Sequence, residues 1–166
     1  MHALTVDDDV LSLAVAENAL AQMGYQARTV PTARAALEVI QQQRIRLVII
    51  SWNLRTSPPG SGGISGLDLC RAIRAKDLHG YVHIIMMVDP NEPCQRMEGL
   101  HAGVDCFLNK PLAPAELLVG LKAAERVRAL ETRDLALLAL AKLAESRDTE
   151  AGAHIERMQA FTQTLA

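Results

Sequence analysis

The stretch Leu47-Val48-Ile49-Ile50-Ser51-Trp52-Asn53 predicts the fold most directly. It opens with four apolar residues, three of them β-branched, which is typical of a strand that is buried on both faces inside a parallel sheet. Ser51 stands where this strand is expected to end, at the carboxyl edge of the sheet. Reactive groups and ligands collect at that edge in such proteins.

Further strand patterns occur on both sides of this stretch, and helical patterns separate them. Strands are expected at residues 3–6, 26–30, 47–51, 81–88 and 104–108, and helices from Val10, from Pro31-Thr32 through Gln43, from Gly66, over residues 92–101 and from Pro114. Residues 55–65, rich in Pro, Gly and Ser, are expected to form a loop. Strands alternating with helices predict an α/β fold, a doubly wound five-stranded parallel sheet with helices on both faces.

Length and composition limit the possible functions. A chain of 166 residues with 49% apolar residues can form one ordinary domain with a helical extension. The net charge of -2 gives no electrostatic argument for binding nucleic acid or an anionic membrane. Three cysteines without CxxC spacing argue against a disulfide framework or a zinc site. Neither a signal peptide nor a membrane-spanning apolar run is visible, so we expect a soluble, cytoplasmic protein.

The carboxyl ends of four expected strands can be read from the sequence. They are Asp7-Asp8 after the first, Ser51 after the third, Val88-Asp89 after the fourth and Asn109-Lys110 after the fifth. Two carboxylates and a lysine in one crevice suit a hard cation and a phosphoryl group. The alternative is a solvated helix start, in which Asp8 or Asp9 caps the helix that begins at Val10.

The run AGVDCFLNKP at residues 102–111, together with the polar strand ends, resembles the CheY-like receiver domain of two-component response regulators. The resemblance covers residues 1–126. It implies a flavodoxin-like sheet of order 2-1-3-4-5, in which an aspartate ending the third strand takes a phosphoryl group from a histidine kinase with the help of Mg²⁺. It also implies that a Ser or Thr ending the fourth strand and an aromatic residue on the fifth, here Phe107, respond to the phosphate, which pairs with Lys110.

The sequence departs from this family at two positions. Ser51 replaces the phosphoacceptor aspartate, and Val88, without a hydroxyl, replaces the switch Ser or Thr. A serine needs an adjacent base to act as a nucleophile, and no histidine ends a neighbouring strand. The loss of a carboxylate predicts that Mg²⁺ binds only weakly, at Asp7, Asp8 and the carbonyl of Asn53.

We therefore expect a pseudo-receiver that is not phosphorylated and in which Lys110 forms an ion pair with Asp7 or Asp8. Two alternatives remain open. Ser51 can be a small polar residue with no role, or the chain can be a working receiver with a displaced acceptor such as Asp8 or Asp89. A histidine kinase or another signalling protein is the expected partner.

Residues 115–145 contain neither Gly nor Pro except Gly120 and are dominated by helix-forming residues. So many leucines on a helix predict a homodimer contact, although Asp134 interrupts the heptad pattern. The region 127–166 is therefore expected to be a helical linker followed by the start of another domain.

The segment 132–157 resembles the opening of the HD-GYP cyclic di-GMP phosphodiesterase domain. The resemblance implies that Glu150 and His154, four residues apart on a helix, occupy metal-ligand positions of that family. The alternative is that they are an exposed helix pair. The His-Asp pair and the Gly-Tyr-Pro motif of the family do not occur in this sequence, so we expect no enzymatic activity from the chain as given. A longer parent protein is expected to carry the remainder of an HD-GYP domain.

Overall fold

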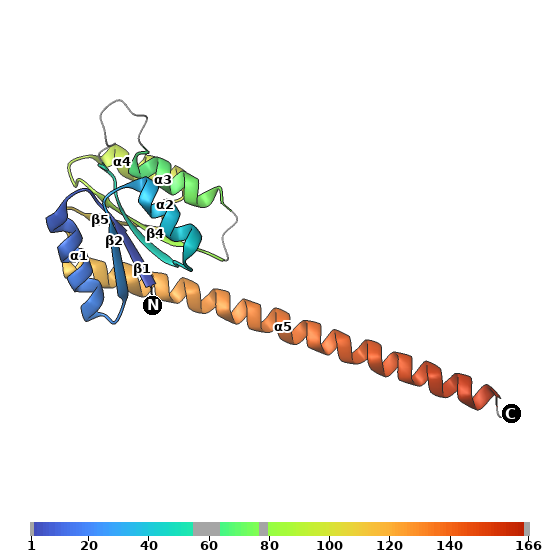
Figure 1. Ribbon diagram of the computed structural model, residues 1–166. Helices are drawn as coiled ribbons and strands as arrows, with labels where there is room; N and C mark the ends of the chain where they lie inside the picture. Colours follow the sequence, from blue (N-terminus) through green and yellow to red (C-terminus); the bar gives the residue numbers. More distant parts are fainter. Residues whose placement is uncertain (1, 55–63, 77–79, 165–166) are drawn as a thin grey trace. The chain divides into compact units, whose positions relative to one another are not determined.

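The computed structural model describes residues 2–54, 64–76 and 80–164, with side chains described up to Leu143 except that of Pro93. Its centre is a single sheet of five parallel strands in the order β2-β1-β3-β4-β5 (Figure 1). The strands are β1 (His2–Val6), β2 (Gln26–Val30), β3 (Leu47–Ser51), β4 (His83–Val88) and β5 (Cys106–Asn109). The predicted fold class and strand order are therefore confirmed.

Each strand is followed by a helix, and side chains in the preceding residues begin several of them. The helices are α1 (Val10–Gln22), α2 (Ala33–Gln42), α3 (Gly66–Arg74), α4 (Pro93–His101) and α5 (Pro114–Thr164). Asp9, Thr32 and Ser65 accept backbone N–H groups of α1, α2 and α3, which would otherwise lack a partner. The expected cap of the first helix is thus Asp9.

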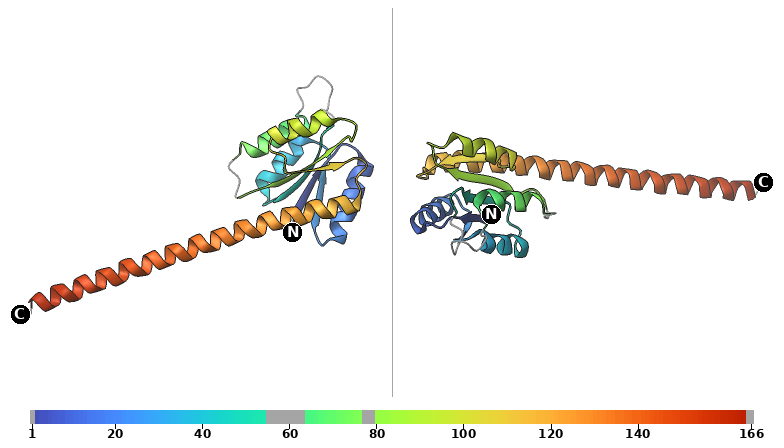
Figure 2. Two further views of the ribbon diagram at one scale, coloured as in Figure 1. Left: turned by 180° about the vertical axis from the view of Figure 1, so that it is seen from behind. Right: turned by 90° about the horizontal axis from the view of Figure 1, so that it is seen from above.

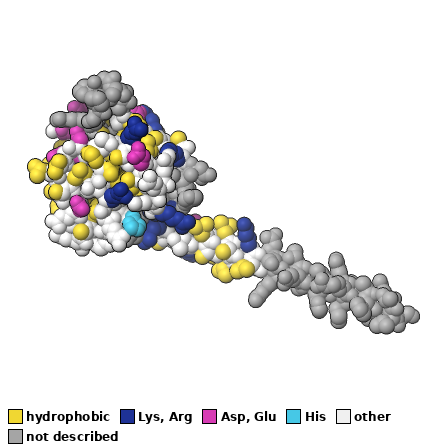
Figure 3. Space-filling view, viewed as in Figure 1, with side chains coloured by type: hydrophobic (Ala, Val, Ile, Leu, Met, Phe, Trp, Pro, Cys, Tyr) yellow, Lys and Arg dark blue, Asp and Glu magenta, His cyan; other side chains and the backbone are white. Residues whose placement is uncertain are grey.

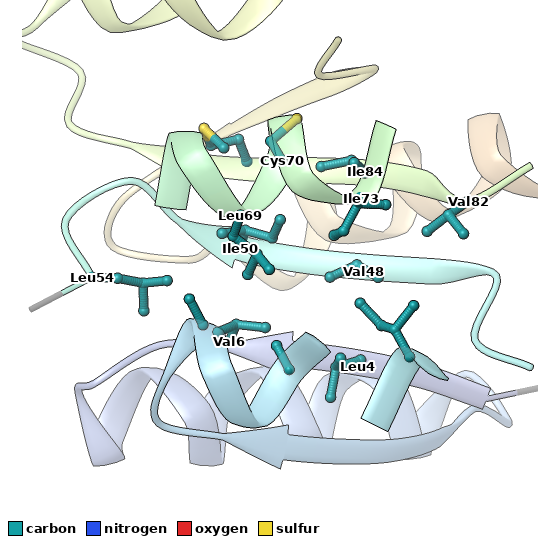
Figure 4. Close-up of a cluster of buried hydrophobic side chains, with 14 of the residues drawn as sticks. Leu4, Val6, Val48, Ile50, Leu54, Leu69, Cys70, Ile73, Val82 and Ile84 are labelled. Carbon is teal, nitrogen blue, oxygen red and sulfur yellow. The ribbon is translucent and has the colours of Figure 1, made fainter. Parts of the chain in front are cut away.

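The helices cover both faces of the sheet (Figures 1 and 2). Val48 and Ile50 of β3 belong to a cluster that also contains residues of α2 and α3 (Figure 4). Leu47 and Ile49 point to the opposite face, into a cluster with residues of α1 and the first part of α5. Because successive strand residues alternate between faces, β3 is buried throughout, as its sequence predicts.

The register aligns the carboxyl ends of the strands. Val6 of β1 lies opposite Ile50 of β3, which in turn lies opposite Met86 of β4, and Met86 lies opposite Phe107 of β5. Asp7, Ser51, Val88 and Asn109 therefore come to one edge of the sheet.

Two strands begin later than the sequence predicts. β4 begins at His83, not Tyr81, because the carbonyls of Tyr81 and Val82 accept hydrogen bonds from arginine side chains and not from a neighbouring strand. β5 begins at Cys106, not Val104. The N–H of Ile84 on β4 donates to the Asp105 carboxylate and is therefore not available for strand pairing before Cys106. The expected loop at residues 55–65 falls mostly outside the described residues.

The chain divides into two compact units, Met1–Ala124 and Glu125–Ala166. Within the first unit, α5 contributes the buried residues Leu117, Leu121 and Ala124. In the second unit, all the described side chains belong to α5. Figure 3 shows that hydrophobic side chains gather on this part of the helix. Among the described residues no helix combines the length and apolar character needed to cross a bilayer.

Candidate functional site

The centre of the carboxyl-edge crevice is an ion pair between Asp7 and Lys110. The Lys110 Nζ atom lies 2.7 Å from Asp7 Oδ2, and the Asp7 side chain is completely buried, whereas that of Lys110 is 31% exposed. The backbone N–H of Lys110 donates to the carbonyl of Val88, which continues the β4–β5 ladder and fixes the position of the lysine. The ion pair expected from the sequence is thus present, with Asp7 as its acid.

Asp7 is held as a carboxylate by several donors. Burial raises the pKa of Asp7, but the hydrogen bonds from Lys110, Ser12 and the Asp9 N–H, together with the charge of Lys110, lower it below the usual range. Both carboxylate oxygens already accept hydrogen bonds, Oδ1 from Asp9 and Oδ2 from Lys110. A cation at this carboxylate would therefore have to compete with the lysine.

Ser51 ends β3 as predicted and is completely buried. Its hydroxyl Oγ has no hydrogen-bond partner, which is unusual because buried hydroxyls nearly always have one. A Cβ atom added to Gly66, the first residue of α3, would lie 2.1 Å from the carbonyl oxygen of Ser51. The start of α3 therefore packs directly against the backbone of Ser51, and only glycine permits this approach.

The other sequence-predicted positions lie along the same edge. Val88, the last residue of β4, is buried and offers no hydroxyl to the crevice. Asn53 is exposed, two residues beyond β3, and Asp8 is half-buried next to Asp7. Among the described residues no group of three or more His, Cys, Asp or Glu is arranged to hold a metal ion. Asp8 and the Asn53 carbonyl are the available additions to Asp7 in a cation site.

Phe107, the second residue of β5, is half-buried and packs against α4. A Cβ atom added to Gly99 of α4 would lie 2.7 Å from the Phe107 ring, so the ring occupies space that only a glycine leaves. The guanidinium of Arg96 lies 5.6 Å from the ring centroid and donates to Asn109 Oδ1 at 2.7 Å. Arg96 and Gly99 therefore fix the ring position.

The sequence interpretation did not identify Gly66, Arg96 or Gly99 as site residues. Gly99 lies inside a helical pattern, where a glycine costs about 1 kcal/mol relative to alanine. That cost is the signal that could have indicated a close approach by another part of the chain. The contact of Arg96 with Asn109 joins two separate elements, and no local pattern indicates it.

Chemically, the centre of the crevice is an acid that is neutralised by a lysine. Asp7 and Lys110 balance each other, Ser51 has no base among its hydrogen-bond partners, and Val88 cannot donate to an anion.

Comparison with known proteins identifies the family. The model of the response regulator receiver domain matches residues 3–125. The chain belongs to this receiver family. Receiver domains are non-enzymatic modules of two-component systems that work with kinases and output domains.

The similar proteins agree with this assignment. The phosphate regulon transcriptional regulatory protein PhoB of Pseudomonas aeruginosa is 31% identical over 123 residues, 74% of this chain and 51% of that protein. The response regulator RppA of Synechocystis is 33% identical over 129 residues, 76% of this chain and 51% of RppA. This chain therefore spans about half the length of these curated relatives.

Solved structures show the same fold. A putative response regulator from Chloroflexus aurantiacus superposes with a TM-score of 0.66 at 28% identity and covers 74% of this chain and 95% of that one. The chemotaxis protein CheY4 of Vibrio cholerae gives a TM-score of 0.66 at 25% identity, with 74% and 97% coverage. These similarities concern the first unit, the receiver domain.

Glu150 and His154, the expected metal-ligand positions of the second unit, lie on α5. Their side chains are outside the described part of the structure. Their role stays a prediction.

Proposed function

We propose that this receiver domain is a pseudo-receiver, a signalling module that does not take a phosphoryl group and regulates a downstream output domain through contacts of its helices. The observation that supports this most is the buried Ser51 hydroxyl, which has no hydrogen-bond partner and therefore no base to activate it. The buried valine at position 88 supports it independently, because it could not respond to a phosphate.

We also propose that the crevice around Asp7 binds Mg²⁺ only weakly. Asp7, Asp8 and the carbonyl of Asn53 would hold the ion, which would bring the positive charge that a phosphoryl oxygen requires. The ion pair with Lys110 already neutralises Asp7, and Ser51 contributes no charge. A divalent cation is therefore expected to bind less strongly here than in a site with a third carboxylate.

Restoring the missing groups tests the proposal. The Ser51→Asp variant, alone and with Val88→Thr, is incubated with Mg²⁺ and acetyl phosphate and then examined by intact mass spectrometry. A base-labile phosphoryl adduct on the variants, and none on the natural chain, would support the proposal. An adduct on Asp8 or Asp89 of the natural chain would instead identify a working receiver with a displaced acceptor.

The proposed helix contact is a homodimer through the second unit. Leu130, Leu138 and Leu143 are each about 60% exposed, and so much exposed leucine on one helix favours burial against another helix. A second copy of the chain is the natural partner because a symmetric dimer is the commonest assembly.

A second candidate function is that the chain forms the amino-terminal part of an HD-GYP cyclic di-GMP phosphodiesterase. Five leucines, each 55–67% exposed, support it: Leu135, Leu137, Leu138, Leu140 and Leu143. At about 100° per residue they surround the helix, whereas a two-stranded coiled coil buries a single stripe. Such a segment favours several helices packed around it, as a downstream helical domain would provide.

The parent reading frame tests the second candidate. A His-Asp pair and a Gly-Tyr-Pro motif downstream of Ala166 would support the phosphodiesterase. A downstream domain of another class would contradict it and leave the pseudo-receiver proposal unchanged.

A further inference from the structure

His83 is the only buried histidine among the residues whose side chains are described. It is the first residue of β4, is 5% exposed, and neither of its ring nitrogens has a hydrogen-bond partner. A neutral imidazole carries one donor and one acceptor, and buried groups of this kind are nearly always paired. His83 lies at the amino edge of the sheet, opposite the crevice, so the proposed function does not involve it.

The last docked turn of α5 packs on the same face of the sheet as His83. His83 lies opposite Leu47 in the sheet, and Leu47 belongs to the cluster that contains Leu121 and Ala124 of α5. A Cβ atom on Gly120 would lie 3.2 Å from Ile85, two residues after His83 on the same face. Because α5 starts at the carboxyl edge and runs back, its next turn lies over the amino edge.

The charged groups near His83 belong to one cluster. Its Nδ1 atom lies 3.8 Å from Asp105 Oδ2, and the Asp105 carboxylate accepts hydrogen bonds from Arg74 of α3, from the Tyr81 hydroxyl and from the N–H of Ile84. Arg74 also donates to the carbonyls of Gly103 and Val82.

Three residues on the same face of the sheet as His83 carry no charge. Leu47 of β3, and Leu121 and Ala124 of α5, are apolar. Cys106 of β5 is half-buried, and burial raises the pKa of its thiol, which therefore stays neutral. Within this part of the structure, Asp105 and Arg74 already balance each other.

A proton on His83 would therefore add an unbalanced charge beneath an apolar helix turn. Burial lowers the pKa of His83; the nearby Arg74 acts in the same direction, and Asp105 opposes it. The ring is accordingly neutral in the folded domain at neutral pH.

We propose that His83 makes the docking of α5 on the sheet sensitive to pH, so that acid releases the turn of Leu121 and Ala124 before the rest of the domain unfolds. The turn that is released belongs to the same helix as the extension, because α5 continues without a break to Thr164. The device acts independently of any phosphoryl chemistry at Ser51.

The direction follows from the two states. When α5 is released, the ring meets water and its pKa returns to about 6.5, whereas in the docked state it is lower. The docked state is therefore favoured above about pH 6.5 and weakened as the pH falls below it. Between pH 7.5 and pH 5.5 the released fraction rises by at most about tenfold.

Hydrogen–deuterium exchange of the full chain at pH 7.5 and 5.5, corrected for the intrinsic exchange rate, tests the proposal. In the natural chain, protection of peptides covering residues 117–124 should fall by up to about tenfold at the lower pH. His83→Gln, which cannot be protonated, should abolish this pH dependence. His101→Gln, at an exposed histidine of α4, should retain it.

Two results would overturn the proposal: the same pH dependence in His83→Gln, or an equal loss of protection in β1 and β3, which would mean global unfolding. If His83→Gln does not fold, NMR of the natural chain decides. The His83 ring and the amides of residues 121–124 should titrate with one midpoint, and different midpoints would contradict the coupling.

Discussion

At the scale of single residues, the ion pair between Asp7 and Lys110 determines the character of the crevice. Asp7 is completely buried, so its carboxylate depends on the lysine for charge compensation. Removing one partner of a buried ion pair costs several kcal/mol, because the other charge is left without compensation. Here the partial exposure of Lys110 reduces that cost.

We predict that Lys110→Gln lowers the free energy of unfolding by about 2 kcal/mol at neutral pH. Urea unfolding followed by the fluorescence of Trp52, the single tryptophan, measures the change. Lys122→Gln, at an exposed lysine of α5, is the matched control and should change it by less than about 0.5 kcal/mol. Equal stability of the two variants would show that the ion pair does not stabilise the fold.

The pH dependence of stability tests the same carboxylate. The pKa of Asp7 is lower in the folded state than its unfolded value of about 3.9, so its ionised form stabilises the fold above that value. This stabilisation is lost as the pH falls through the lowered pKa. The stability difference between the natural chain and Asp7→Asn should therefore be constant above about pH 5 and shrink in acid. A difference that is independent of pH in acid would contradict this origin.

At the scale of elements, the aromatic residue of β5 is fixed by contacts with α4. The Phe107 ring fills the space over Gly99, and Arg96 covers it while bonding Asn109. In a phosphorylated receiver the corresponding aromatic is expected to follow a hydroxyl on the fourth strand, which Val88 lacks. The ring should therefore keep one position in this domain.

Fluorine NMR can follow the position of the Phe107 ring directly. The chain has two phenylalanines, Phe107 and Phe161, so a fluorinated phenylalanine gives few signals to assign. With 4-fluorophenylalanine incorporated, the Phe107 signal should not change on adding Mg²⁺ and acetyl phosphate. Arg96→Ala should shift or broaden it, whereas Arg71→Ala, at an exposed ion pair of α3, should not. An unchanged Phe107 signal in Arg96→Ala would show that the arginine does not hold the ring.

The sequence predicted the elements well because their signals are local. The apolar run of β3, the helix start at Pro31-Thr32 and the long helix after Pro114 each depend on residues within one element. The strand starts at His83 and Cys106 were mispredicted because side-chain hydrogen bonds form there. Arginine side chains bond the carbonyls before β4, and the Asp105 carboxylate before β5 accepts from the N–H of Ile84. The close approach of Gly66 to Ser51 and the cluster around Asp105 depend on the tertiary fold and could not be predicted locally.

At the scale of the whole molecule, the second unit is proposed to join two copies of the chain. Leu138 is 60% exposed and belongs to the leucines that surround α5. Leu138→Glu should weaken dimerisation at least tenfold in sedimentation velocity experiments, since it places a charge in a helix contact. Val10→Glu, at an exposed apolar residue of α1, should leave dimerisation unchanged. Equal behaviour of the two variants would exclude a dimer contact at Leu138.

The proposed inability of this domain to take a phosphoryl group depends on the absence of an acceptor at the carboxyl edge of β3. The most direct test is the intact mass of the natural chain after incubation with Mg²⁺ and acetyl phosphate, measured before and after treatment with base. Because Ser51 has no activating base and Asp7 is paired with Lys110, the mass should not change. A phosphoryl adduct located on Ser51 would contradict the proposal that this domain is not phosphorylated.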